Sequence, residues 1–331
     1  MSALPAAITA SLARLDLRDA TVVALTPDAS DRRYFRVMPA RTDAVVLALH
    51  SAPFAPGTLP FTIVGRLFEQ VPLPVPRVRA EFPELGVLVL DDLGDVTLQA
   101  HTDSAPDDRH RALYERAVDH LIALQRRGAE LAVPGTLPWT LAFDVEKLMW
   151  EMTFFLTHFI EGFRGLTMSS THRGALEAEL GVLVDELAVE PRVLCHRDYH
   201  SRNLMVAGDD LYIIDFQDAR LGPNTYDLVS LLRDCYVDLP PALVAHLVDR
   251  FHRAAGDGEP AEVFAARLDA MGVQRHLKAL GTFGYQAVAR ANPAYAAYVP
   301  RTTAYLRAAF ERRPRFARLR DLLVPLVPDV A

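Results

Sequence analysis

Lysine and cysteine are scarce in this sequence of 331 residues. Lysine occurs only as Lys147 and Lys278, although lysine and arginine together number 35, so arginine carries nearly all of the positive charge. Cysteine occurs only as Cys195 and Cys235, which is too little for a disulfide framework. A reducing compartment therefore fits the composition best.

Long apolar runs are also missing. No window of about 18 consecutive apolar residues occurs, so we expect no transmembrane helix. Residues 1–17 lack a basic region before a continuous apolar run, so we expect no signal peptide. A net charge of −7 argues against nucleic acid as a partner, because phosphate binding requires a basic surface. We therefore expect a cytoplasmic globular monomer that binds neither nucleic acid nor membranes.

A polar string between Val193 and Asp218 carries the strongest functional signal. It contains Asp198, then Asn203, and then Asp215 at the end of an apolar run. Phosphoryl transfer of the protein-kinase type uses such a set: one carboxylate accepts the proton of the attacking hydroxyl, while a carboxamide and a second carboxylate hold Mg²⁺ against the phosphates.

The spacing inside this string predicts a loop followed by a hairpin. We expect strands at 204–206 and 211–214 around the turn residues at 208–210. Such a hairpin would bring Asn203 and Asp215 to the same end, within reach of one cation. Any single Asp-x4-Asn is common, and the prediction depends on the whole string.

Several segments together resemble the aminoglycoside phosphotransferase family of small-molecule kinases. The resemblance lies in His196-Arg-Asp-Tyr-His-Ser-Arg-Asn203, in Ile214–Asp218 and in Tyr226-Asp-Leu228. Within the family, the sequences of segments 30–37, 91–94 and 215–236 look most like those of the bacterial anomeric kinases of cell-wall amino sugars. Those enzymes phosphorylate the C1 hydroxyl of N-acetylmuramate or N-acetylglucosamine. The likeness covers residues 15–310 in order.

The resemblance implies an α+β, protein-kinase-like, bilobal fold that uses ATP and Mg²⁺. It implies a small N-terminal β-sheet lobe at 1–90, a hinge at 91–94 and a larger, mainly helical lobe at 95–331. Asp198 would be the catalytic base, and Asn203 and Asp215 would hold Mg²⁺. The nucleotide would meet the first hairpin tip and the hinge, at Ser30, Arg32, Arg33, Asp91, Asp92 and Leu93.

One expected residue of the nucleotide site is absent. The strand at 45–49 should carry a lysine for the α- and β-phosphates, yet both lysines lie far downstream. Glu69, the sole candidate for its glutamate partner, comes late in the following helix. Anchoring of the triphosphate must then come from Mg²⁺, backbone amides and arginines, or the protein is catalytically dead.

The acceptor is expected on the helical lobe. The candidates that would meet it are Glu151, His200, Arg202, Gln217, Asp218, Arg220 and Arg301. Alternatively, Asp218 pairs with Arg220 and only stabilises its loop, and the arginine-rich stretch 301–320 forms solvated helix faces. His196 and Asp227 are expected to support the catalytic loop, and His196 with His200 is not expected to bind a metal.

Hydrophobic periodicity predicts the remaining elements. Helices are expected at 5–17, 58–70, 144–163 and 174–189, with further helices after Pro240 that are broken at Gly256, Gly258 and Gly272. The best interpretation is an ATP-dependent C1 kinase of a small N-acetylated amino sugar. A kinase of an aminoglycoside or of another sugar is the alternative, and a nucleotide-binding pseudokinase is a third possibility.

Overall fold

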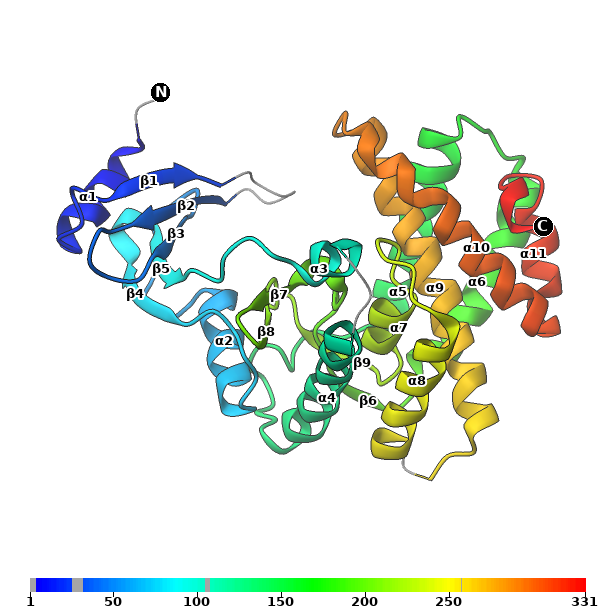
Figure 1. Cartoon of the computed structure of the whole chain (residues 1–331). Coiled ribbons are helices and arrows are strands. Elements are labelled where there is room, and N and C mark those ends of the chain that lie inside the picture. Colours follow the sequence, from blue (N-terminus) through cyan, green and yellow to red (C-terminus); the bar gives the residue numbers. More distant parts are fainter. Residues whose placement is uncertain (1–3, 26–31, 105–107, 257) are drawn as a thin grey trace. The chain divides into compact units, whose positions relative to one another are not determined.

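The computed structural model describes residues 4–25, 32–104, 108–256 and 258–331. The chain forms two compact units, one of residues 1–97 with 204–218 and the other of 98–203 with 219–331. Figure 1 labels the helices and strands of both units. The lobe boundaries at 1–90, 91–94 and 95–331 stay a prediction.

The first unit contains a five-stranded antiparallel sheet in the order β1-β2-β3-β5-β4. Its strands are β1 (Thr21–Ala24), β2 (Arg33–Met38), β3 (Val45–Leu49), β4 (Val78–Phe82) and β5 (Val87–Asp91). β3 and β5 are central and almost wholly buried, as expected for apolar β-branched runs. Helix α1 (Ala6–Arg14) adds Ile8 and Leu12 to their core.

Helix α2 and a late hairpin complete this unit. α2 (Pro60–Gln70) presents Phe61 and Phe68 to the ring of Phe216, which follows the hairpin of β7 (Leu204–Ala207) and β8 (Asp210–Ile213). Backbone bonds from Val206 to Val96 and from Ile213 to Pro74, both 2.8 Å long, attach the hairpin. The hairpin predicted from the turn residues at 208–210 is therefore confirmed.

The second unit is mainly helical. Its helices are α3 (Leu98–Ser104), α4 (Asp108–Glu130), α5 (Val145–Phe155), α6 (Ser170–Ala188), α7 (Tyr226–Leu232), α8 (Pro241–Ala255), α9 (Ala261–Val288), α10 (Val299–Arg312) and α11 (Ala317–Leu323). A short antiparallel pair, β6 (Arg192–Cys195) and β9 (Arg220–Pro223), lies among them. α5 continues as a π-helical segment through Phe163, so the helix predicted at 144–163 is confirmed with a change of winding.

Helix α9 runs without interruption through Gly272, so the predicted break at this glycine is wrong. A Cβ there would lie 2.7 Å from a guanidinium nitrogen of Arg233, and the glycine makes room for that side chain. Further along, Gly281 and Gly284 let α9 approach the backbone of α5 and its π-helical continuation. α9 therefore packs closely against α5 and also contacts α7 and α10 (Figure 1).

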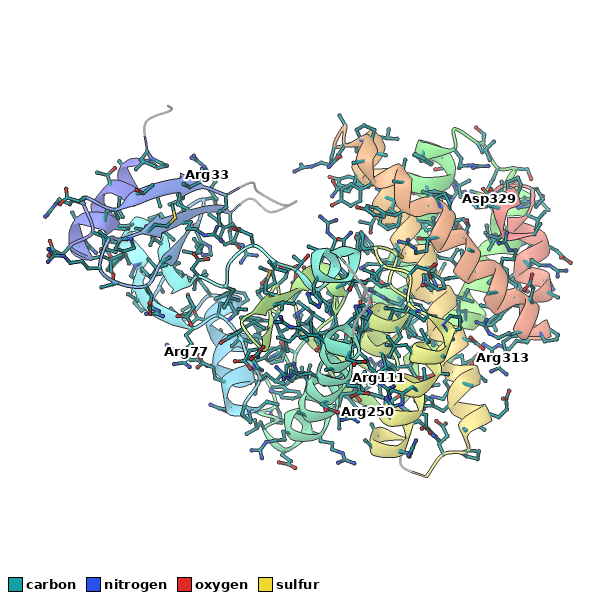
Figure 2. All side chains as sticks on the ribbon, in the orientation of Figure 1. Arg33, Arg77, Arg111, Arg250, Arg313 and Asp329 are labelled. Carbon is teal, nitrogen blue, oxygen red and sulfur yellow. The ribbon has the colours of Figure 1, made fainter. Side chains whose placement is uncertain are left out.

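Arginines of the C-terminal stretch form ion pairs within the second unit. Arg313, labelled in Figure 2, and Arg312 bind the buried carboxylate of Asp269, at 2.7 and 2.9 Å. Arg315 of the following turn pairs with Glu186 of α6. None of the helices in the described ranges is both long and apolar enough to cross a membrane.

Candidate active site

Two buried carboxylates fix the loop that carries Asp198 and Asn203. After β6 the loop runs from His196 to a 3₁₀ turn at Ser201–Asn203. Asp227 accepts the backbone N–H groups of His196 and Arg197, at 2.6 and 3.0 Å. At the other end, Asp234 accepts the N–H of Ser201 at 2.8 Å. Burial raises the pKa of both carboxyls, and the bonds they accept oppose that rise.

The loop backbone is strained at Arg197, whose φ of 89° lies in the left-handed region. Arg275 of α9 supports this conformation by donating to the Arg197 carbonyl at 3.1 Å and to the Tyr226 hydroxyl at 3.0 Å. The Tyr226 ring stacks on Phe143 with a 4.0 Å centroid distance. Nδ1 of the buried His196 accepts the N–H of Asp198 at 3.3 Å, so this histidine braces the turn.

Asp198 emerges from this loop with its side chain 24% exposed. Nζ of Lys278, on α9, lies 2.8 Å from its Oδ1. Burial alone would raise the pKa of Asp198, but the neighbouring cations, with Lys278 the largest contributor, hold it well below its usual value. The carboxylate is therefore ionised at neutral pH and able to accept a proton only weakly.

The amide of Asn203 is oriented by the same loop. Its Nδ2 donates to the Asp198 carbonyl at 2.9 Å. Within the described residues its carbonyl oxygen accepts no hydrogen bond, which leaves that oxygen available to a cation. Carboxamide and carboxylate oxygens are the hard ligands that Mg²⁺ prefers.

Asp215, in the first unit, follows β8 in a left-handed conformation with a φ of 62°. The packing of Phe216 against α2 positions it, and Gln217 donates to its Oδ1 at 2.7 Å. A Cβ added at Gly65 would lie 3.3 Å from the Phe216 ring, so this glycine permits the close packing. Asp218 is the last residue of the same unit.

The other predicted nucleotide contacts also lie in the first unit, except that Ser30 falls outside the described residues. Arg32 precedes β2, and its charge helps lower the pKa of His50 after burial. Arg33, at the start of β2, lies 5.2 Å from the Phe35 ring (Figure 2). These two arginines flank the end of the segment predicted to cover the phosphates.

The two acidic residues at the end of β5 are held by arginines. Asp91 pairs with the guanidinium of Arg79 and accepts the backbone N–H of Arg77 at 3.1 Å, and Asp92 pairs with Arg36 at 2.8 Å. Leu93 follows them. Their side chains thus shape the segment, and recognition of a base there would fall to the backbone.

The predicted acceptor residues of the second unit lie in different environments. Glu151 is 1% exposed and accepts from Gln274 of α9 at 2.8 Å. The ring of His200 lies edge-on to Tyr236, and burial lowers its pKa to about 3, so it is neutral. The guanidinium of Arg202 lies 4.9 Å from the same tyrosine ring.

The two remaining arginines are also engaged. Arg220, 8% exposed, lies 5.3 Å from the Phe143 ring. Arg301 donates to the Cys235 carbonyl at 3.1 Å. Cys195 and Cys235 are both buried free thiols.

Sequence reasoning missed three residues that contact this loop: Lys278, Arg275 and Asp234. Lys278 is one of only two lysines, but the kinase pattern places the expected lysine on the strand at 45–49. Nothing local marks Arg275, because it lies 78 residues from the carbonyl it binds. Only the tertiary packing of α9 brings these cations to the loop.

Comparison with known proteins identifies the family. The sequence pattern of the phosphotransferase enzyme family matches residues 21–264. The chain belongs to this family. It is similar to proteins named N-acetylmuramate/N-acetylglucosamine kinase from Neisseria meningitidis, at 35% identity over 94% of this chain and 92% of that protein. The equivalent from Pseudomonas putida is 33% identical over 92% of this chain and 88% of that protein.

The fold is that of kinase-like phosphotransferases. A solved structure described as a streptomycin–ATP–APH(2″)-IIa ternary complex matches with a TM-score of 0.59 and 14% identity, covering 86% of this chain and 95% of that one. At this identity the match concerns the fold alone. The predicted α+β architecture, with a small sheet unit and a mainly helical unit, is confirmed.

Proposed function

We propose that this chain is an ATP-dependent kinase that phosphorylates the C1 hydroxyl of N-acetylmuramate or N-acetylglucosamine. The observation that carries the proposal is the 33–35% identity, over more than nine-tenths of the chain, to proteins named for these two sugars. The catalytic loop supplies the chemistry that such a reaction needs. Cytoplasmic location and a monomeric state stay predictions.

In this proposal Asp198 is the base for the acceptor hydroxyl. Two features support it: the loop backbone is fixed at both ends by buried carboxylates, and nearby cations keep the Asp198 side chain ionised. A C1 hydroxyl is a hemiacetal and more acidic than other sugar hydroxyls. A weak carboxylate base is therefore better matched to C1 than to an ordinary alcohol.

Asn203 and Asp215 are proposed to hold Mg²⁺ together with the nucleotide phosphates. The free carbonyl oxygen of Asn203 and the carboxylate of Asp215 fit such an ion by ligand type. The described residues contain no group of three or more His, Cys, Asp or Glu side chains that could hold a metal alone, which is compatible with a cation shared with phosphate. When bound, Mg²⁺ would neutralise charge on the transferring phosphoryl group.

The other candidate residues are proposed to bind either ATP or the sugar. Ser30, Arg32 and Arg33, with the backbone near Asp91, Asp92 and Leu93, would bind ATP without the usual lysine. Glu151, His200, Arg202, Gln217, Asp218, Arg220 and Arg301 are the candidates that would line the sugar site. Arg301 also donates a hydrogen bond to the Cys235 carbonyl.

A panel of acceptors tests this function. Purified protein is incubated with Mg-ATP and one acceptor at a time, and ADP release is measured. We expect turnover with N-acetylmuramate or N-acetylglucosamine and none with gentamicin or streptomycin. Turnover with an aminoglycoside alone would contradict the sugar assignment, and ATP binding without turnover of any acceptor would favour a pseudokinase.

A further inference from the structure

Lys278 is the cation closest to the Asp198 carboxylate within the described chain. Its Nζ lies 2.8 Å from Oδ1, whereas Arg275 is 3.7 Å from the same oxygen and Arg197 is 3.5 Å from Oδ2. Only 16% of the Lys278 side chain is exposed, so most of its stem is shielded from solvent. The ion pair joins the loop to α9.

The two α9 cations have different contacts. Arg275 is committed to the loop backbone and to the Tyr226 hydroxyl. The Lys278 ammonium hydrogen-bonds Asp198 alone among the residues that the structure describes. An ammonium carries three donors, and one of them bonds Asp198.

The two carboxylate oxygens of Asp198 differ in the hydrogen bonds that they accept. Oδ1 accepts the hydrogen bond of Lys278, while Oδ2 accepts none from the described part of the chain. A carboxylate held at one oxygen cannot rotate freely, so the other oxygen keeps a fixed direction. That direction is what a base requires if it is to meet an incoming hydroxyl.

We propose that Lys278 is a positioning residue for phosphoryl transfer, which holds Oδ1 of Asp198 so that Oδ2 meets the acceptor hydroxyl. The inference rests on the kinase function proposed above. The acceptor oxygen bonds to the γ-phosphorus, and the bond from that phosphorus to the β–γ bridging oxygen breaks. ADP leaves with the electron pair, and the hydroxyl proton passes to Oδ2.

A merely structural role for Lys278 makes a different prediction. If the lysine only neutralises a half-buried carboxylate, its loss lowers stability and leaves the kinetics of the folded fraction unchanged. If it positions Asp198, its loss lowers kcat while the KM values for ATP and sugar stay nearly the same, because neither ligand loses its own contacts.

Kinetics of Lys278→Met and Lys278→Arg separate the two roles. We expect Lys278→Met to lower kcat by roughly 10²-fold, as for a displaced catalytic group. Lys278→Arg keeps the charge with another geometry and should recover part of the rate. Arg253→Gln removes a cation from the exposed pair with Asp249 and serves as the control, with the kcat of the parent protein.

Chemical restoration covers the case in which Lys278→Met does not fold. Lys278→Cys is treated with 2-bromoethylamine, which rebuilds an ammonium of nearly lysine length, or with iodoacetamide, which adds a neutral group. Both native cysteines are buried, which favours reaction at the new thiol. We expect recovery of kcat with the first reagent only, and equal rates after both reagents would overturn the proposal.

Other results would overturn the inference without touching the kinase function. A Lys278→Met variant with the kcat of the parent would do so, as would one with a raised sugar KM and unchanged kcat. If the parent turns over a different acceptor of the panel, the sugar assignment fails. The kcat and KM of Lys278→Met and of the parent are then compared with that acceptor. The two failures are therefore distinguishable.

Discussion

Asp198 owes its properties to side chains from two other parts of the chain, the region of α7 and helix α9. Asp227 and Asp234 fix the backbone on either side of it, and Lys278 fixes one carboxylate oxygen. Each buried group has a partner, which offsets the desolvation that would otherwise be costly. The site is therefore a small network of charged groups in which the removal of one leaves another without its partner.

Replacing Asp198 by asparagine tests the base directly. The amide keeps the shape of the side chain and removes the proton acceptor, so turnover should fall by roughly 10²–10⁴-fold with ATP binding retained. Turnover is measured in a coupled assay and ATP affinity by titration calorimetry. Asp185→Asn, at an exposed position on α6, is the matched control. Near-parental turnover of Asp198→Asn would remove Asp198 from the role of base.

A contact of this site can be predicted from the sequence when its two residues lie close together along the chain. Asp198 and Asn203 belong to one short string of residues, and the turn residues at 208–210 determine the hairpin that follows. The local sequence pattern is therefore enough to predict both. Lys278 lies 80 residues further along, and its partner is fixed only by helix packing. The sequence contained the lysine but no local feature that says where its ammonium goes.

Helix α9 is the element that brings two cations to the loop of Asp198. It carries Arg275 and Lys278, and it approaches the backbone of the α5 segment at Gly281 and Gly284. A Cβ at Gly284 would lie 2.3 Å from the carbonyl oxygen of His158, which cannot move as a side chain could. The glycines therefore set the depth at which α9 packs.

Gly284→Ala should force α9 away from this backbone. We expect a loss of about 1–3 kcal/mol in the free energy of unfolding, measured by urea denaturation, and a lower kcat because Lys278 moves with the helix. Gly181→Ala on α6 is the control, since nothing lies within 4 Å of its added Cβ. That variant should gain about 0.5–1 kcal/mol. Equal stability of the two variants would contradict the packing argument.

At the scale of the whole molecule, several arginines form ion pairs that join elements of the helical unit, and both lysines lie in that unit. Asp269 of α9, whose side chain is 2% exposed, binds Arg233, Arg312 and Arg313 and so ties α9 to α10 and to the end of α7. Burial would raise the pKa of Asp269, but these arginines outweigh it and lower the pKa. The expectation that the arginine-rich end is mostly solvated therefore missed a buried network, because its acidic partner lies more than 40 positions away.

Asp269→Asn should destabilise the protein by about 3–5 kcal/mol at pH 7, because it leaves buried cations unpaired. The folded pKa of Asp269 is depressed, so its contribution is present above the unfolded value of about 3.9 and is lost as the pH falls through the folded value. Urea unfolding at several pH values should show the difference from the parent shrinking in acid. Asp119→Asn breaks the exposed pair with Arg250 and should cost about 0–1 kcal/mol. A pH-independent difference for Asp269→Asn would argue against the ion pairs as its cause.

The position of the new phosphate is the most direct test of the proposed function. The product of the reaction with N-acetylglucosamine or N-acetylmuramate is analysed by ³¹P–¹H correlation NMR, and the methyl glycoside, whose C1 oxygen is blocked, is assayed beside it. We expect coupling of phosphorus to the C1 proton and no turnover of the methyl glycoside. A 6-phosphate product, or unimpaired turnover of the methyl glycoside, would contradict it.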